Sequence, residues 1–131
     1  MKKRSEIKAW VAKAEQDLQA ATFLAGKRKK PVPEIVCFHC QQAAEKYLKG
    51  YLAGENIPFP KTHDLASLRA LAAVRLPEIE LVFGLLKYLN RFSVLPRYPG
   101  ENATTEQAKR ALKAAVAVRN FFASRLPGIP D

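Results

Sequence analysis

The chain has 131 residues, 48% of them hydrophobic, and a formal net charge of +10. This size and composition predict one globular domain over residues 1–131, with a core that needs neither disulfides nor a metal. No apolar run reaches the roughly 18–20 residues that cross a bilayer, and no apolar segment follows the basic N-terminus, so we expect a cytoplasmic protein without membrane contact. The positive charge favours anionic partners, and a solvated basic surface is the alternative interpretation.

The sequence pattern predicts helices almost throughout. Apolar residues recur every three or four positions over residues 5–25, and Gly26 with the basic cluster 27–30 ends this first helix. A second helix is predicted from Pro33, which suits a first helical turn, to Ala53.

Two prolines make residues 55–61 a loop before the third predicted helix. We expect Thr62 or His63 to be the N-cap of this helix, with Asp64 in its first turn. The leucines from Leu65 onward form its core face.

The sequence pattern also predicts helices in the second half of the chain. A fourth helix is predicted over 77–89, and a long connection follows at 90–103. Thr104 and Gln107 form a capping box for a last helix that runs to about residue 125. The pattern contains no strand-like alternation. We therefore predict an all-α fold, an antiparallel up-and-down bundle of four to five helices.

Cys37 and Cys40 have C-x-x-C spacing. A redox role would need a strand–helix–strand context, which the pattern does not provide, and a zinc site would need further ligands. We predict instead two small buried side chains on one helix face, and no metal or other cofactor.

The second predicted helix carries a row of polar residues, which we call the polar stripe: His39, Gln42, Lys46 and Lys49. Their three- and four-residue spacing places them on one side of the helix, so we expect them to be exposed to water, a ligand or another chain. The lysines would meet phosphate as point charges, while His39 and Gln42 would contact a base or ribose.

Residues outside this helix complete the predicted site. Lys61, His63 and Asp64 lie in the turn before the third helix, and Arg97 and Tyr98 lie in the long connection. We expect Arg97 to bind phosphate and Tyr98 to stack on the ligand. The alternative is that the histidines only cap or line helices and the lysines are only solvated.

Four segments together resemble the HEPN family, the higher eukaryotes and prokaryotes nucleotide-binding domain. These are the first helix around Trp10 and Asp17, the stretch 38–49 (FHCQQAAEKYLK), and the turn 61–65 (KTHDL) with the later Arg-Tyr-Pro at 97–99. The resemblance spans essentially the whole chain. It implies a helical bundle that is commonly a homodimer and is often paired with a small nucleotidyltransferase in a toxin–antitoxin-like module.

Many members of that family are metal-independent ribonucleases that use an arginine followed four to six residues later by a histidine, near the start of the last helix. This chain has no histidine after residue 104, and no arginine stands at that distance before His39 or His63. It therefore resembles the branch without the ribonuclease motif.

We accordingly predict a non-catalytic module that binds a nucleotide or RNA, associates with a small nucleotidyltransferase, or both. One alternative is a metal-independent ribonuclease toxin that uses His39 or His63 with a distant arginine such as Arg97. Another alternative is a purely structural helical dimer. A homodimer is expected because Phe38 and Leu52 lie outside the main apolar stripe of their helix, where a second chain would cover them.

Overall fold

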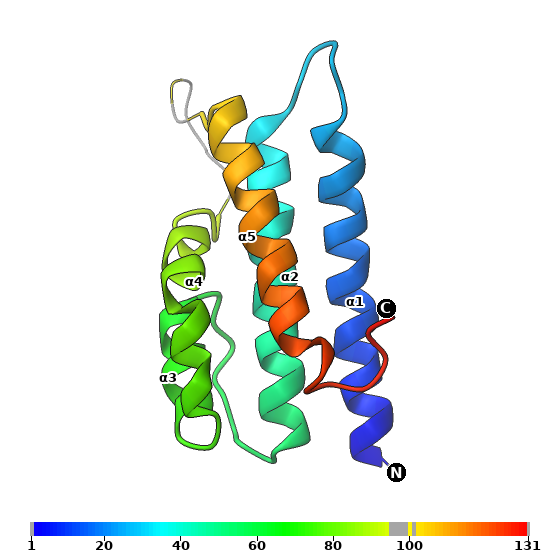
Figure 1. The fold of residues 1–131 in the computed structure, drawn as a ribbon, viewed down its shortest axis with the longest axis vertical. Coiled ribbons are helices and arrows are strands. Elements are labelled where there is room, and N and C mark those ends of the chain that lie inside the picture. The colour runs from blue at the N-terminus through cyan, green and yellow to red at the C-terminus, as the bar shows by residue number, and fades with distance from the viewer. Residues whose placement is uncertain (1, 95–99, 101, 131) are drawn as a thin grey trace.

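The computed structural model describes residues 2–94, 100 and 102–130, and these residues form helices and connecting loops without a strand (Figure 1). In chain order the elements are α1 (Lys2–Ala25), α2 (Pro33–Gly54), α3 (Leu65–Ala73), the short 3-10 helix η1 (Pro77–Val82), α4 (Phe83–Asn90) and α5 (Thr105–Ala123). The predicted all-α bundle is confirmed. Across the described part of the chain, no helix is both long enough and apolar enough to cross a membrane.

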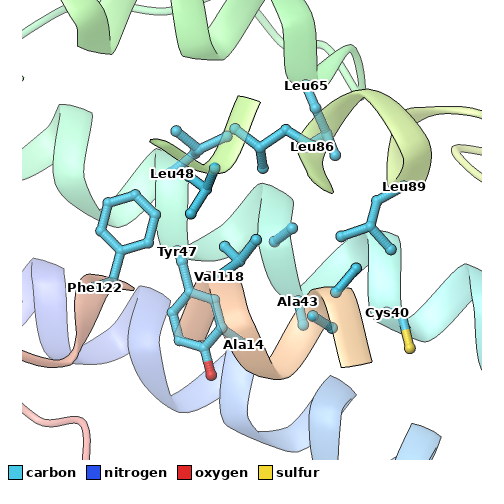
Figure 2. Packing of buried hydrophobic residues seen from close by; sticks show 14 of the residues in the cluster. Ala14, Cys40, Ala43, Tyr47, Leu48, Leu65, Leu86, Leu89, Val118 and Phe122 are labelled. Atoms are coloured by element: carbon cyan, nitrogen blue, oxygen red, sulfur yellow. The ribbon is translucent and has the colours of Figure 1, made fainter. Parts of the chain in front are cut away.

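Helix α2 is the centre of the bundle, because α1, α3, α4 and α5 all pack against it. Figure 1 shows α1 beside α2 on one side and the α3–α4 pair on the other, with α5 crossing in front. The core therefore surrounds α2 on several sides. Figure 2 shows this cluster, to which α2 contributes Tyr47 and Leu48. The four other α-helices contribute Ala14, Leu65, Leu86, Leu89, Val118 and Phe122.

This central position corrects one prediction. Leu52 is fully buried within the single chain, although it lies outside the main apolar stripe of α2. A helix enclosed by four neighbours buries residues on almost every side, so Leu52 does not need a second chain to cover it. Phe38 is only partly buried.

A close approach of α1 to α2 depends on Gly50. A Cβ atom added to this glycine would lie 3.1 Å from the Cβ of Trp10, which is tighter than ordinary packing. The missing side chain thus lets the two longest helices pack closely, and it brings the polar residues of α2 against α1.

The start of α3 differs from the prediction, because its N-cap is Asp64 and not Thr62 or His63. The Asp64 carboxylate accepts hydrogen bonds from the Ala66 amide at 3.2 Å, from the Ser67 hydroxyl, and from the Asn90 side chain at 2.8 Å. The bonds from Ser67 and then Asn90 hold the pKa of Asp64 below its ordinary value. Asp64 is therefore engaged in fixing the start of α3.

The other helix boundaries lie close to the predicted ones, and one segment differs in helix type. Residues 77–82, predicted as the start of one α-helix, form the 3-10 helix η1, and α4 follows it directly. The capping box of Thr104 and Gln107 is present at the start of α5. Cys37 and Cys40 are free and fully buried, as predicted, and burial raises their pKa values to about 11 and about 12.

Candidate functional site

The polar stripe meets a buried carboxylate of α1. Asp17 lies between the core positions Ala14 and Ala21 of that helix, so its side chain faces α2. Its Oδ1 lies 2.8 Å from Nδ1 of His39, and its Oδ2 forms an ion pair with Lys46. One acidic residue therefore binds two members of the stripe.

A second buried carboxylate, Glu45, binds the other half of the site. Its Oε2 lies 3.0 Å from the Lys49 ammonium, and its Oε1 lies 2.8 Å from Nδ1 of His63. The Gln41 amide, also buried, donates to the backbone carbonyl of His63 at 2.8 Å, and Gln42 donates to Gln41 at 2.7 Å. These bonds tie the turn before α3 to the middle of α2.

The prediction that the stripe lysines are exposed is wrong. Lys49 is buried, and its ammonium lies 5.9 Å from the ring centre of Trp10 and 6.0 Å from that of Phe59. Lys46 is partly buried beside Asp17. Because α1 packs closely against α2, both lysines are covered and paired with carboxylates. They are not available as free point charges for a phosphate.

The histidines are held in one orientation by these carboxylates. An ionised carboxylate carries no hydrogen, so the hydrogen in each contact belongs to the Nδ1 atom of His39 or His63. In the neutral ring, Nε2 is then the free acceptor. The His63 side chain is 62% exposed, whereas His39 is mostly covered.

The structure assembles most, but not all, of the predicted site. Five of its side chains form two clusters on α2: His39 and Lys46 bind Asp17, while Gln42, Lys49 and His63 belong to the cluster around Glu45. Lys61 is exposed two residues before His63. Asp64 caps α3 instead of facing either cluster. Arg97 and Tyr98 lie outside the described residues.

Sequence reasoning overlooked the residues that orient the site: Asp17, Gln41 and Glu45. Asp17 has a usable signal, since an acidic residue among the core positions of an amphipathic helix needs a buried partner. Glu45 and Lys49 have the four-residue spacing of a helical ion pair. Gln41 has no such local signal, because its partner is a backbone carbonyl of another segment.

A separate polar cluster joins three helices and the C-terminal segment. Arg119 of α5 forms two hydrogen bonds to Glu15 of α1, at 2.9 and 3.1 Å, and a third to the Pro130 carbonyl at 2.7 Å. Tyr47 of α2 donates its hydroxyl to Glu15. Burial would raise the pKa of Glu15, but the bonds from Arg119 and Tyr47 hold it below its ordinary value. This cluster links α1, α2 and α5.

The chain was compared with known proteins. No curated protein and no solved structure matched it. The model of the HEPN domain family matches residues 7–126, which is nearly the whole chain and includes both carboxylate–histidine pairs. The chain therefore belongs to the HEPN domain family.

Proposed function

We propose that this chain is a non-catalytic HEPN-type module that binds a nucleotide or a short RNA along the polar side of α2. Family membership connects the chain with nucleotides or RNA. The observation that carries the proposal is that His39 and His63 are each fixed through Nδ1 to a buried carboxylate. Each ring nitrogen left over is an oriented acceptor for a ribose hydroxyl or a base amino group.

The positive charge for a phosphate comes from Lys61 in this proposal. Lys61 is exposed, and none of the carboxylates that the structure describes forms an ion pair with it. The buried Lys46 and Lys49 act as positioning residues, because they balance the charge of Asp17 and Glu45. Among the described residues, Lys61 is the one cation of this site without a carboxylate partner, so binding should be weak and should decrease with salt.

Titration with ATP and with a short RNA tests the proposal. His63→Ala and Lys61→Ala should each weaken binding by about threefold to tenfold, the range expected for one hydrogen bond or one screened contact. The matched control is Arg28→Ala/Lys29→Ala, which removes two exposed cations from the loop between α1 and α2. Equal binding by wild type, His63→Ala and Lys61→Ala would contradict the assignment of the site.

Association with a small nucleotidyltransferase and homodimer formation are further parts of this proposal. Both rest on the family match rather than on a surface of the single chain. Light scattering at high micromolar concentration should give the mass of a dimer. A monomer under those conditions would contradict the dimer, and it would leave the nucleotide titration unaffected.

A metal-independent ribonuclease is the second candidate, and the same histidines favour it. An imidazole oriented by a carboxylate is the arrangement of a general acid or base. RNA cleavage in the presence of EDTA, abolished by both His39→Ala and His63→Ala, would support the enzyme and overturn the non-catalytic proposal. If the chain neither cleaves nor binds RNA, nucleotides or a nucleotidyltransferase, the two clusters serve stability alone.

A further inference from the structure

A hollow of about 470 Å³, which we call the α4–α5 hollow, lies between α4, α5 and the end of η1. Its apolar lining includes Leu81 and Leu85, and its charged lining consists of Arg110 and Lys113 of α5. Leu81 is 79% exposed although it is a large apolar residue. The hollow thus combines apolar side chains at the surface with basic groups.

The charge around this hollow is positive. No ion pair with a carboxylate in the described ranges involves Arg110 or Lys113 of its lining. The same holds for Lys87 of α4 and for Arg91, the C-cap of α4. The two nearby acidic residues Glu80 and Glu106 are paired with other cations, Arg69 and Lys109. Among the described residues, the cations that line and flank the hollow therefore have no carboxylate partner, and they form a basic rim.

The hollow is poorly suited to stacking a nucleic-acid base. Tyr88, the one aromatic residue among the described residues of its lining, is buried, with the guanidinium carbons of Arg110 and Arg91 at 3.9 and 4.7 Å from the ring centre. Base stacking on single-stranded nucleic acid needs an open aromatic face. The accessible apolar groups are aliphatic instead, and aliphatic groups match the side chains of a protein.

We propose that the α4–α5 hollow docks an acidic amphipathic helix of a different protein. Leucine-like side chains on one face of that helix would pack on Leu81 and Leu85, and flanking carboxylates would pair with Arg110 and Lys113. Charge complementarity identifies this partner, because an acidic rim would match the basic one. A second copy of this chain would bring another surface of a protein with net charge +10. This site is separate from the nucleotide site on α2.

The test uses the full chain and three probes of similar length. The first is a synthetic helical peptide of about four turns with leucine at i, i+3, i+4 and i+7 and glutamate elsewhere. The second has the same composition in scrambled order, and the third is an oligouridine RNA. Fluorescence anisotropy measures affinity, and amide chemical shifts locate the contact. We expect the patterned peptide to bind at least about tenfold more tightly than the scrambled one, with shifts on α4 and α5.

Charge reversal in the hollow should remove this preference. Arg110→Glu/Lys113→Glu should weaken the patterned peptide by at least about tenfold, while Arg28→Glu/Lys29→Glu, with the same change in net charge, should have less than about a threefold effect. Leu81→Ser is a second variant that leaves the charge unchanged and should also weaken binding. Thermal unfolding followed by circular dichroism shows whether each variant is folded.

Several results would overturn the proposal. Equal affinity for the patterned and scrambled peptides, or an equal effect of the two charge reversals, would mean attraction by net charge alone. Failure of the patterned peptide to bind at millimolar concentration would also reject it. If oligouridine shifts the α4 and α5 amides and the peptide does not, the hollow is a nucleic-acid surface.

Discussion

Replacing Glu45 by glutamine would leave the Lys49 ammonium buried without a counterion. The Lys49 side chain is 9% exposed and that of Glu45 is 4% exposed, with 3.0 Å between the charged atoms. Removing one partner of a buried ion pair typically costs about 3–5 kcal/mol, because the remaining charge stays out of water. Since the glutamine carbonyl can still accept one hydrogen bond, we expect a loss of about 3 kcal/mol in the free energy of unfolding.

The converse change should cost less. In Lys49→Met the side chain keeps its packing near Trp10 and Phe59, and Glu45 keeps its contact with His63. We expect a loss of about 1–2 kcal/mol, because Glu45 loses one charged hydrogen bond and retains the others. In the double variant no buried ammonium remains. Its loss in the free energy of unfolding should therefore be smaller than the sum of the two single losses, by at least about 1.5 kcal/mol.

Urea unfolding followed by circular dichroism gives the four free energies of this cycle. The control cycle uses Glu106 and Lys109, whose side chains are 84% and 68% exposed at 3.5 Å separation. Its coupling should stay below about 0.5 kcal/mol, as for other exposed pairs. A loss under about 1 kcal/mol in Glu45→Gln, or additive effects at Glu45 and Lys49, would refute the reasoning that this pair is buried and coupled.

Three further predictions concern the fold. Asp64→Ala should lower the free energy of unfolding by about 1–2 kcal/mol through loss of the N-cap. Hydrogen bonds accepted from Ser67 and Asn90 lower the pKa of Asp64, so its contribution to the free energy of unfolding is present above the ordinary carboxyl pKa and disappears as pH falls through the lowered value. A difference in this free energy between wild type and variant that stays constant down to strongly acidic pH would contradict this. Cys37 and Cys40, with pKa values raised by burial to about 11 and about 12, should react with a thiol reagent at neutral pH only after addition of urea, and rapid labelling of the native protein would count against it. Gly50→Val should lower the free energy of unfolding by about 1–3 kcal/mol, since its Cβ would lie 3.1 Å from a side-chain atom of α1. Gly84→Val is the control and should change stability much less, because an added Cβ there meets nothing within 4 Å. Similar losses in both variants would show that close packing is not the cause.

Several features of this protein follow from local sequence alone. The three- and four-residue spacing of apolar side chains predicts the helices, and the prolines and glycines between them predict most of the boundaries. The capping box of Thr104 and Gln107 is a contact between residues three apart, so it can also be read locally. The helical context of the C-x-x-C pair predicts that Cys37 and Cys40 are buried, and the structure confirms it. The motif segments also led to the correct family.

Tertiary structure decided the partners and the exposure of the polar stripe. Asp17 lies 22 residues from His39 and 29 residues from Lys46, and only the packing of α1 on α2 brings them together. The four-residue spacing of Glu45 and Lys49 is visible in the sequence, but their burial depends on the segments that cover α2. Helical periodicity reports which side of a helix a residue occupies. What lies opposite that side depends on how several helices fill one core. Because of this non-local packing, Lys46 and Lys49 form ion pairs within the chain instead of the exposed charges that the periodicity predicts.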